Sequence, residues 1–156
     1  MIDIRYGSLA DAELIRKIMF RAFAEYVRTI APSSALQETA SSITTSMLHG
    51  EQVLIAFDGS TAVGIVRFMI CIDALYFYRL AIIPEKRGRG IAKMLLRRLE
   101  TEATDYRRNA VICRVRRREL RNLHLYRSDG FQIFGDEEIV HKPLTVLHVI
   151  WMRKFI

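Results

Sequence analysis

Hydrophobic and polar positions along the chain follow two periods, and the shorter one is typical of β-strands. Short apolar or alternating runs are bounded by glycine, proline and polar residues, as strands are. Asp58-Gly59 stands between two such runs and predicts a hairpin turn. The run at residues 74–83 is mostly apolar, which indicates a strand buried on both faces. Strands are predicted at residues 2–6, 52–57, 61–72, 74–83, 110–115, 131–141 and 145–154, the last two being separated by Pro143.

Apolar residues spaced three and four apart predict helices between these strands. Ser8 is followed by Asp11 at nearly the spacing of a capping box, so a helix is expected to begin there. A second helix is predicted at residues 35–48, and a short one at residues 120–128 ends at Asp129-Gly130. The first helix has Ile15, Ile18, Met19, Ala22, Phe23 and Tyr26 on one face, and a helix after Gly90 has Ile91, Met94, Leu95, Leu99 and Ala103. This order of elements predicts a mixed α/β domain with a central sheet.

Length and composition limit the class of protein. A chain of 156 residues is the size of one domain, so residues 1–156 are expected to fold as a single unit. The longest apolar stretch, near residues 75–84, is interrupted by Arg79 and is too short to span a bilayer. The first residues lack the pattern of a signal peptide. Cys71 and Cys113 stand in apolar runs without metal-ligand spacing, so we expect two buried free thiols, no metal and a cytoplasmic location.

Net charge adds a candidate ligand. The formal charge is +7, and the arginines gather in residues 106–121, "YRRNAVICRVRRRELR", and in "EKRGRG". Such clusters are found on solvated basic faces, in nucleic-acid-binding proteins and at sites for small ligands with several phosphates. The sequence shows neither an aromatic-interleaved basic stripe nor a helix suited to reading bases, which argues against nucleic acid.

The glycine-rich segment Arg87-Gly88-Arg89-Gly90-Ile91-Ala92-Lys93 is the clearest candidate binding motif. It follows a predicted strand and begins a predicted helix, an order that collects backbone N–H groups around an anion. It is not a Walker loop, because no Lys-Ser or Lys-Thr follows at the required distance. It is not a dinucleotide fingerprint, because Lys93 stands where the third glycine belongs. A pyrophosphate would suit the glycines, the helix N-terminus and the cationic side chains.

Two segments resemble the GNAT superfamily of N-acetyltransferases. "RLAIIPEKRGRGIAKMLLRRLE" resembles the acetyl-CoA-binding core of that family, and "NLHLYRSDGF", residues 122–131, resembles its second signature. The order of predicted strands and helices also agrees with the family. The resemblance implies a central twisted mixed sheet of about seven strands, flanked by about four helices. It also implies that one pair of strands is splayed apart to admit acetyl-CoA.

The resemblance further implies direct acetyl transfer from acetyl-CoA to an amine, without a covalent enzyme intermediate. Tyr126 matches the family tyrosine that protonates the departing thiolate. Backbone groups of residues 80–82 would bind the pantetheine arm, and residues 88–93 would bind the pyrophosphate. Asn122 would contact the cofactor near its thiol, although a surface role is the alternative. The implied cofactor-binding residues are Leu80, Ala81, Ile82, Arg87, Gly88, Arg89, Gly90, Ile91, Ala92, Lys93, Asn122 and Tyr126.

The chain departs from the family pattern at an asparagine and at the general base. Many members have asparagine seven residues before the tyrosine, where this chain has Glu119, and Asn122 stands four residues before it. The strand positions that carry a glutamate base in other members hold Arg114 and Tyr76 here. No base is therefore assigned. By residue type the candidates are Glu25, Glu38, Asp73, Glu137, Glu138, His124, His141 and His148, and for each of them a solvated surface position is the simpler interpretation.

The acceptor is expected to contact residues 23–39 and 136–146, by analogy with the family; for residues 23–39 the alternative is a loop that only closes over the core. Glu25, Tyr26 and Tyr76 are the candidate substrate-binding residues. Positive charge in the cleft favours an acidic acceptor over a polyamine. The leading hypothesis is an acetyl-CoA-dependent N-acetyltransferase acting on a primary amine of a small molecule or peptide. The alternative is an acyl-CoA-binding module with little transferase activity, and the last strand is a candidate homodimer edge.

Overall fold

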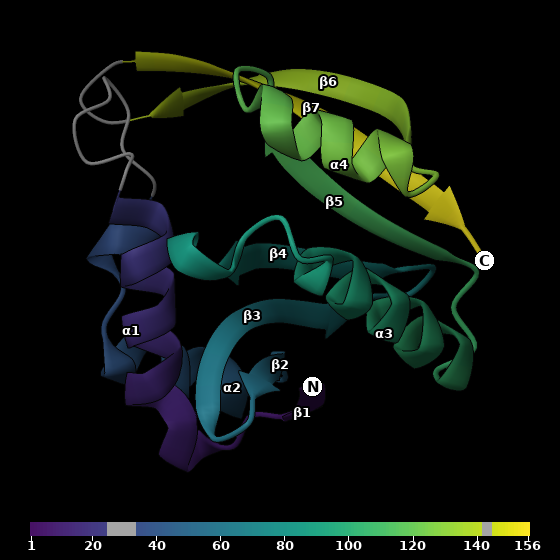
Figure 1. Ribbon diagram of the computed structural model, residues 1–156. Helices are drawn as coiled ribbons and strands as arrows, with labels where there is room; N and C mark the ends of the chain where they lie inside the picture. Colours follow the sequence, from purple (N-terminus) through teal and green to yellow (C-terminus); the bar gives the residue numbers. More distant parts are fainter. Residues whose placement is uncertain (25–33, 142–144) are drawn as a thin grey trace. The chain divides into compact units, whose positions relative to one another are not determined.

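The computed structural model describes residues 1–24, 34–141 and 145–156 (Figure 1). Its contacts divide the chain into two compact units, which are described separately. The N-terminal unit comprises Met1–Met69 and Phe77–Arg98, and the C-terminal unit comprises Ile70–Tyr76 and Leu99–Ile156. Seven strands are hydrogen-bonded in the order β1-β2-β3-β4-β5-β7-β6. In the described residues no helix is long and apolar enough to cross a membrane.

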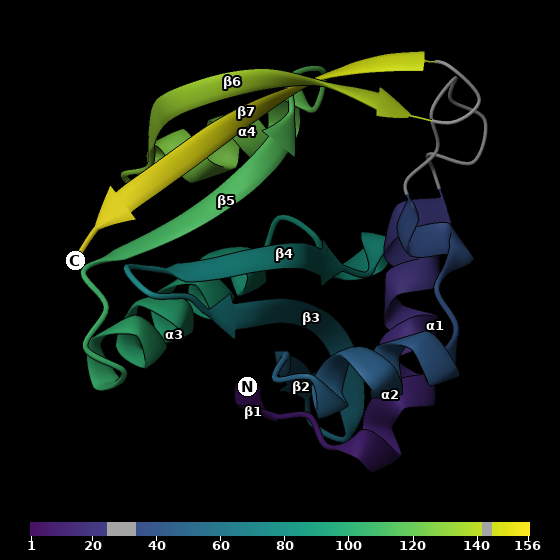
Figure 2. The same ribbon diagram turned by 180° about the vertical axis from the view of Figure 1, so that it is seen from behind.

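The N-terminal unit is an antiparallel β-meander with helices on both faces. β1 (Ile2–Tyr6), β2 (Gln52–Asp58) and β3 (Thr61–Ile70) pair in sequence order, and β4 (Leu75–Ile82) follows β3. Figures 1 and 2 show α2 (Ala40–Leu48) and α3 (Ile91–Asp105) on opposite faces of these strands. Completely buried side chains fill the core, among them Ile15, Met19, Ile43, Leu54, Ile65 and Phe68.

The predicted first helix is correct, and its start has an additional turn. A 3₁₀ turn at Leu9–Asp11 precedes α1 (Ala12–Phe23). The Ser8 backbone N–H donates to Asp11 Oδ2 over 2.8 Å, which satisfies a donor at the helix start.

The predicted helix at residues 35–48 begins five residues too early. Residues Ser34–Gln37 form a separate 3₁₀ turn, and α2 is Ala40–Leu48. Thr39 caps α2, because its Oγ1 accepts from the Ser42 N–H over 3.0 Å while the Ser42 hydroxyl accepts from the Thr39 N–H over 2.9 Å. This reciprocal pair gives the backbone a helix start at residue 40 that apolar spacing does not reveal.

The C-terminal unit is a sheet of strands with one helix against it. β7 (Thr145–Phe155) lies between β5 (Ala110–Arg116) and β6 (Gln132–His141) and is antiparallel to both. The last strand is thus paired on both sides, so the prediction that it forms a free edge for a homodimer is wrong. The start of β4 pairs in parallel with β5 through Leu75↔Val111 and Tyr76↔Ile112, so the sheet is mixed, as predicted. Figures 1 and 2 show α4 (Leu120–Ser128) against one face of β5, β7 and β6.

Together with α3 (Ile91–Asp105), the described residues contain four α-helices, so the predicted class and numbers of elements are confirmed. Two further details of the sequence analysis are wrong. β3 ends at Ile70, and the Cys71 N–H donates to the Ala74 carbonyl over 2.8 Å in a turn, which leaves Cys71 exposed rather than buried. Cys113 is buried, and burial raises the pKa of its thiol.

A buried ionic cluster occupies the N-terminal unit around Arg67 of β3, whose side chain is only 2% exposed. Arg67 Nε donates to Glu51 Oε2 over 2.8 Å, and its Nη1 donates to Glu38 Oε2 over 2.7 Å. The Tyr78 hydroxyl of β4 donates to Glu51, and the Arg67 guanidinium lies 5.5 Å from the centre of the Tyr78 ring. Arg79 Nε also donates to Glu38 Oε2, over 3.1 Å. The cluster therefore joins β3, β4, the residue just before β2 and the segment before α2.

The two carboxylates preserve the charge of Arg67. Burial works to lower the pKa of the Arg67 guanidinium, but its hydrogen bonds to Glu51 and Glu38 outweigh burial, and the pKa is raised. Burial raises the pKa of Tyr78, and the hydrogen bond to Glu51 raises it further, so the phenol keeps its proton as a donor. A charge that is buried with partners in this way is costly to leave alone.

Gly64 of β3 permits a close approach to β4. A Cβ at residue 64 would lie 2.6 Å from Ile82 Cδ1 and 3.1 Å from the Ala81 carbonyl oxygen. The Ile83 N–H donates to the Val63 carbonyl over 3.0 Å, which continues the contact past the end of β4. Only glycine at residue 64 leaves room for Ala81 and Ile82 in this position.

We expect Gly64→Ala to destabilise the protein by about 1–3 kcal/mol, because the added methyl group overpacks the contact with Ile82 and Ala81. Urea unfolding would measure the change. Gly135→Ala is the matched control, because a Cβ there has its nearest neighbour at an ordinary 3.8 Å. Equal stability of the two variants would contradict the packing argument.

Arg67→Ala should destabilise the fold by about 3–5 kcal/mol, because it leaves the carboxylates of Glu38 and Glu51 without their shared cation. The free energy of unfolding in urea is the measurement. Arg16→Ala removes an arginine from the exposed pair with Glu13 and should barely move the midpoint. A loss in Arg67→Ala no greater than in Arg16→Ala would show that the cluster is not structural.

Candidate functional site

The glycine turn between β4 and α3 has its backbone turned toward open space. Gly88 and Gly90 have φ values of 78° and 80°, in the left-handed region that glycine tolerates best. Both are exposed, and a Cβ on either would meet no atom within 4 Å. The turn can therefore accept a ligand against its main chain.

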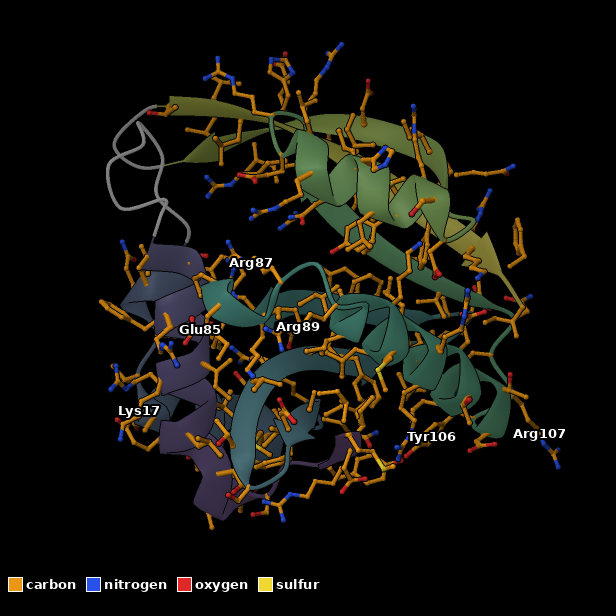
Figure 3. All side chains as sticks on the ribbon, in the orientation of Figure 1. Lys17, Glu85, Arg87, Arg89, Tyr106 and Arg107 are labelled. Carbon is orange, nitrogen blue, oxygen red and sulfur yellow. The ribbon has the colours of Figure 1, made fainter. Side chains whose placement is uncertain are left out.

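Side chains of the segment just before the glycines attach this turn to the rest of the N-terminal unit, and Figure 3 labels Glu85 and Arg87 among them. Arg87 Nη2 donates to the Ala22 carbonyl at the end of α1 over 2.9 Å, and its Nε donates to the Ile82 carbonyl over 3.2 Å. Glu85 forms an ion pair with Arg21 of α1. Lys86 Nζ contacts Asp58 Oδ2 over 3.0 Å and lowers the pKa of that carboxyl. Arg87 thus has a structural role, and its predicted contact with the cofactor stays a prediction.

Three sources of positive charge converge at the same turn. Arg89 and Lys93 are exposed. α3 begins at Ile91, and the Met94 N–H donates to the Gly90 carbonyl over 3.1 Å, so the positive end of the helix dipole lies at the glycines. Amides in the first turn of a helix have no acceptor within the helix. This arrangement fits a ligand with a pyrophosphate group.

The predicted pantetheine strand is the end of β4. Ala81 and Ile82 are buried, whereas Leu80 is half-buried. Arg79, directly before them, has φ 55°, an uncommon value for a residue with a long side chain. A left-handed residue inside a strand is typical of a β-bulge. The backbone of β4 is therefore irregular where the family resemblance expects the cofactor strand.

The second motif forms α4 of the C-terminal unit. Asn122 and Tyr126 are one turn apart and lie on the same face of the helix. Tyr126 is 5% exposed, and its ring centre lies 5.8 Å from that of Phe131. Gly130, with φ 98°, ends the helix, and the Phe131 N–H donates to the Tyr126 carbonyl over 2.9 Å. The Tyr-x-x-x-Gly-Phe pattern is thus a helix stop that fixes the tyrosine.

Tyr76, the third candidate for acceptor binding, belongs to an aromatic cluster in the C-terminal unit. Its ring centre lies 5.9 Å from that of Trp151. Trp151 Nε1 donates to Glu137 Oε1 over 3.0 Å, and the Arg114 guanidinium lies 5.7 Å from the Trp151 ring centre. Sequence reasoning missed Trp151, because only strand register places it beside Tyr76 and Arg114.

The structure does not single out a general base among the candidates. Glu38 is bound to Arg67 and Arg79, and Glu137 accepts from Trp151. His148 lies 3.6 Å from Glu138, and both are exposed. Asp73 and His124 are exposed, as the simpler interpretation expected. Glu25 and Tyr26 lie outside the described residues, as does the side chain of His141.

The residues around Arg67 were not predicted as a group. Arg67 interrupts the apolar run "VGIVRFMI", and this was the only signal for it in the sequence.

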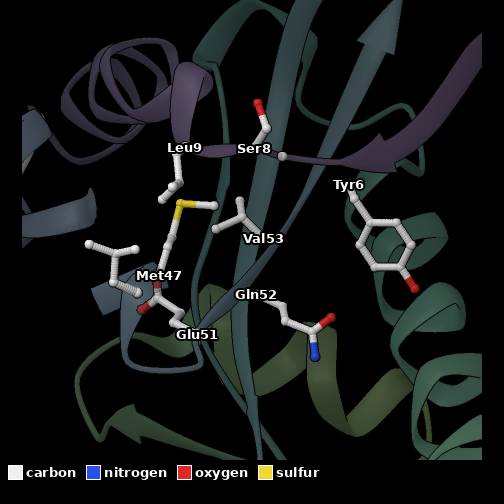
Figure 4. Close-up of a pocket in the computed structure, with 9 residues that line it drawn as sticks. Tyr6, Ser8, Leu9, Met47, Glu51, Gln52 and Val53 are labelled. Carbon is white, nitrogen blue, oxygen red and sulfur yellow. The ribbon is translucent and has the colours of Figure 1, made fainter. Parts of the chain in front are cut away.

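A pocket elsewhere in the N-terminal unit does not match the predicted site (Figure 4). Among the described residues that line it, only Glu51 has a charged side chain, and its oxygens accept hydrogen bonds from Arg67 and Tyr78. The pocket offers no cation for a phosphate, and it contains none of the predicted cofactor residues. Its lining is Tyr6, Gly7, Ser8, Leu9, Met47, Leu48, Glu51, Gln52 and Val53.

Solved structures of several acetyltransferases have a similar fold. The ribosomal-protein-alanine N-acetyltransferase of Brucella melitensis matches with a TM-score of 0.80 and 21% identity, covering 99% of both chains. The PaiA N-acetyltransferase of Thermoplasma acidophilum, in complex with coenzyme A, matches with a TM-score of 0.77 and 19% identity, covering 100% of this chain and 99% of that one. A mutant of the spermidine N-acetyltransferase SpeG of Vibrio cholerae matches with a TM-score of 0.74 and 20% identity, covering 99% of this chain and 93% of that one.

The sequence comparisons identify the family. A search of curated proteins finds no significant match. The family model for the acetyltransferase (GNAT) domain matches residues 49–133, which include the glycine turn, Asn122 and Tyr126. The matched segment is more than half of the 156 residues. Fold, motifs and family model agree, and the chain belongs to the GNAT acetyltransferase family.

Proposed function

We propose that this protein is an acetyl-CoA-dependent N-acetyltransferase that passes the acetyl group directly to a primary amine of a small molecule or peptide. GNAT enzymes use acetyl-CoA as cosubstrate. The observation that carries the proposal is the glycine turn, in which two exposed glycines with positive φ, two exposed cations and a helix N-terminus form an anion site. The same residues match the pyrophosphate-binding motif of the family.

We assign the cofactor contacts to the two units separately. In the N-terminal unit, main-chain groups of residues 80–82 would bind the pantetheine arm, and residues 88–93 would bind the pyrophosphate. Arg87 would support them through its bonds to Ala22 and Ile82. In the C-terminal unit, Asn122 would contact the thiol end of the cofactor. Bound acetyl-CoA would supply the activated acetyl thioester.

Tyr126 is assigned as the proton donor to the CoA thiolate. Its position in the Tyr-x-x-x-Gly-Phe motif and its burial on α4 support this role, because a phenol in a fixed position can deliver a proton over a short hydrogen bond. Tyr76 is assigned to the acceptor side, beside Trp151.

The acceptor is assigned only as an amine. Two similar structures belong to enzymes named for different acceptors, an alanine of a ribosomal protein and spermidine. The basic charge of this chain favours an acceptor that carries an acidic group. Acetylation rates that are insensitive to salt for acidic and basic amines alike would contradict this preference.

Acetyl-CoA at about a hundred times its Kd should stabilise the native state by about 2.7 kcal/mol. We expect thermal unfolding to show this shift in the wild type and not in Gly90→Glu, whose carboxylate would repel the pyrophosphate. Gly59→Glu is the matched control, because Gly59 also has a positive φ, 62°, and open space around it. A wild type that does not shift would overturn the proposed function.

Tyr126→Phe should lower kcat by about a hundredfold or more, because it removes the proton donor and keeps the ring. Acetyl-CoA binding by the variant, measured by the same thermal shift, should persist. Turnover would be measured as CoA thiol release over a panel of acidic, neutral and basic amines. Tight acetyl-CoA binding by the wild type without turnover of any amine would favour an acyl-CoA-binding module instead.

A further inference from the structure

The strained residue Arg79 is held at both ends of its guanidinium. Arg79 Nε donates to Glu38 Oε2 over 3.1 Å, and its Nη2 donates to Ser34 Oγ over 2.7 Å. Its φ of 55° is unfavourable for a residue with a Cβ, so the surrounding structure must maintain it. Gly90 and Gly88 reach similar values without this cost.

The cluster connects two consecutive residues of one strand. Side chains of neighbouring strand residues point to opposite faces. Here Tyr78 donates to Glu51 while Arg79 donates to Glu38, and both carboxylates bind Arg67. The left-handed turn at Arg79 thus brings residues 78 and 79 to the same cluster. A regular strand would separate them, so the cluster and the irregular backbone require each other.

A continuous series of hydrogen bonds begins at one residue of β4 and ends at the residue before it. The path runs from Arg79 through Glu38, Arg67 and Glu51 to Tyr78. The side chains of Arg67 and Glu51 are almost completely buried, at 2% and 1% exposure, so their partners are fixed. Met19 of α1 adds a contact, since its Sδ lies 3.6 Å from Arg67 Nη1. These hydrogen bonds therefore fix the backbone orientation of β4 immediately before Leu80.

From this geometry we infer that the Arg67 cluster is a positioning device for the cofactor strand. By holding Arg79 in the left-handed conformation, it fixes the direction of the N–H and C=O groups of residues 80–82. This inference rests on the proposed function, in which those groups bind the pantetheine arm. Glu38, Arg67 and Arg79 contribute to acetyl-CoA affinity through the backbone and are not assigned a contact with acetyl-CoA.

Two substitutions at residue 79 distinguish the effect of its backbone conformation from the effect of its side chain. Arg79→Ala loses the bonds to Glu38 and Ser34 and retains the strain, so Kd and KM for acetyl-CoA should rise roughly fivefold or more. Arg79→Gly loses the same bonds but adopts a positive φ freely, so it should bind acetyl-CoA nearly as the wild type does. For the same reason, Glu38→Ala should weaken binding, and the double variant Glu38→Ala/Arg79→Gly should recover it. Arg16→Ala is the surface control and should match the wild type.

Acetyl-CoA titration by calorimetry and steady-state kinetics test this order of affinities. If Arg79→Ala binds as tightly as the wild type, the positioning role is wrong. If Arg79→Gly loses as much affinity as Arg79→Ala, the side chain and not the backbone matters, and the inference is also overturned. A wild type that binds no acetyl-CoA would refute the proposed function instead.

Hydrogen exchange of backbone amides tests the geometry without any ligand. The Ile83 N–H, bonded to the Val63 carbonyl, and the amides of residues 80–82 report the conformation of this strand. We expect faster exchange there in Arg79→Ala than in Arg79→Gly, whereas amides of β6 and β7 should not change. Equal exchange at residues 80–83 in the two variants would overturn the inference, whatever the binding data show.

Discussion

The N-terminal unit depends on one buried cation. Arg67 lies in the middle of an otherwise apolar strand, and it can remain there only because Glu38 and Glu51 neutralise it and Tyr78 donates to the second carboxylate. The requirement for these partners ties β3 and β4 to the residue that precedes β2 and to the residues that precede α2. Apolar packing would hold strands together in several registers, whereas a charged group with directional partners allows one arrangement. The irregular backbone at Arg79 follows from that arrangement.

The glycine turn shows how the same unit supports a ligand-binding main chain. A Cβ added at either glycine would meet no atom within 4 Å, yet the residues just before them, Glu85, Lys86 and Arg87, are attached to the rest of the fold. Arg87 donates to the carbonyls of Ala22 and Ile82, which attaches the turn to α1 and β4. The remaining exposed cations, Arg89 and Lys93, are then available to an anion. Pre-organised amides lose little entropy when a phosphate binds, and this favours affinity without a large apolar pocket.

The GNAT family and the acetyltransferase fold do not identify the acceptor, which depends on residues particular to this chain. The positions where relatives carry a glutamate base hold Tyr76 and Arg114, and both lie beside Trp151. The same cluster holds the carboxylate of Glu137, which accepts from Trp151 Nε1 over 3.0 Å and lies 3.5 Å from Arg114 Nη1. The fold therefore constrains the cosubstrate more strongly than the acceptor.

The sequence by itself determined the elements, the glycine turn and the helix that carries Tyr126, because periodicity, glycine and capping signals act over a few residues. It placed the start of α2 too early, since the reciprocal Thr39–Ser42 bonds compete with apolar spacing. It predicted a buried Cys71, although β3 ends just before that residue. Only the tertiary structure decided that Glu38, Glu51, Arg67 and Arg79 meet, and that Trp151 lies beside Tyr76. Those contacts join residues far apart in the chain, and strand register and a left-handed residue, neither of which has a local sequence signal, bring them together.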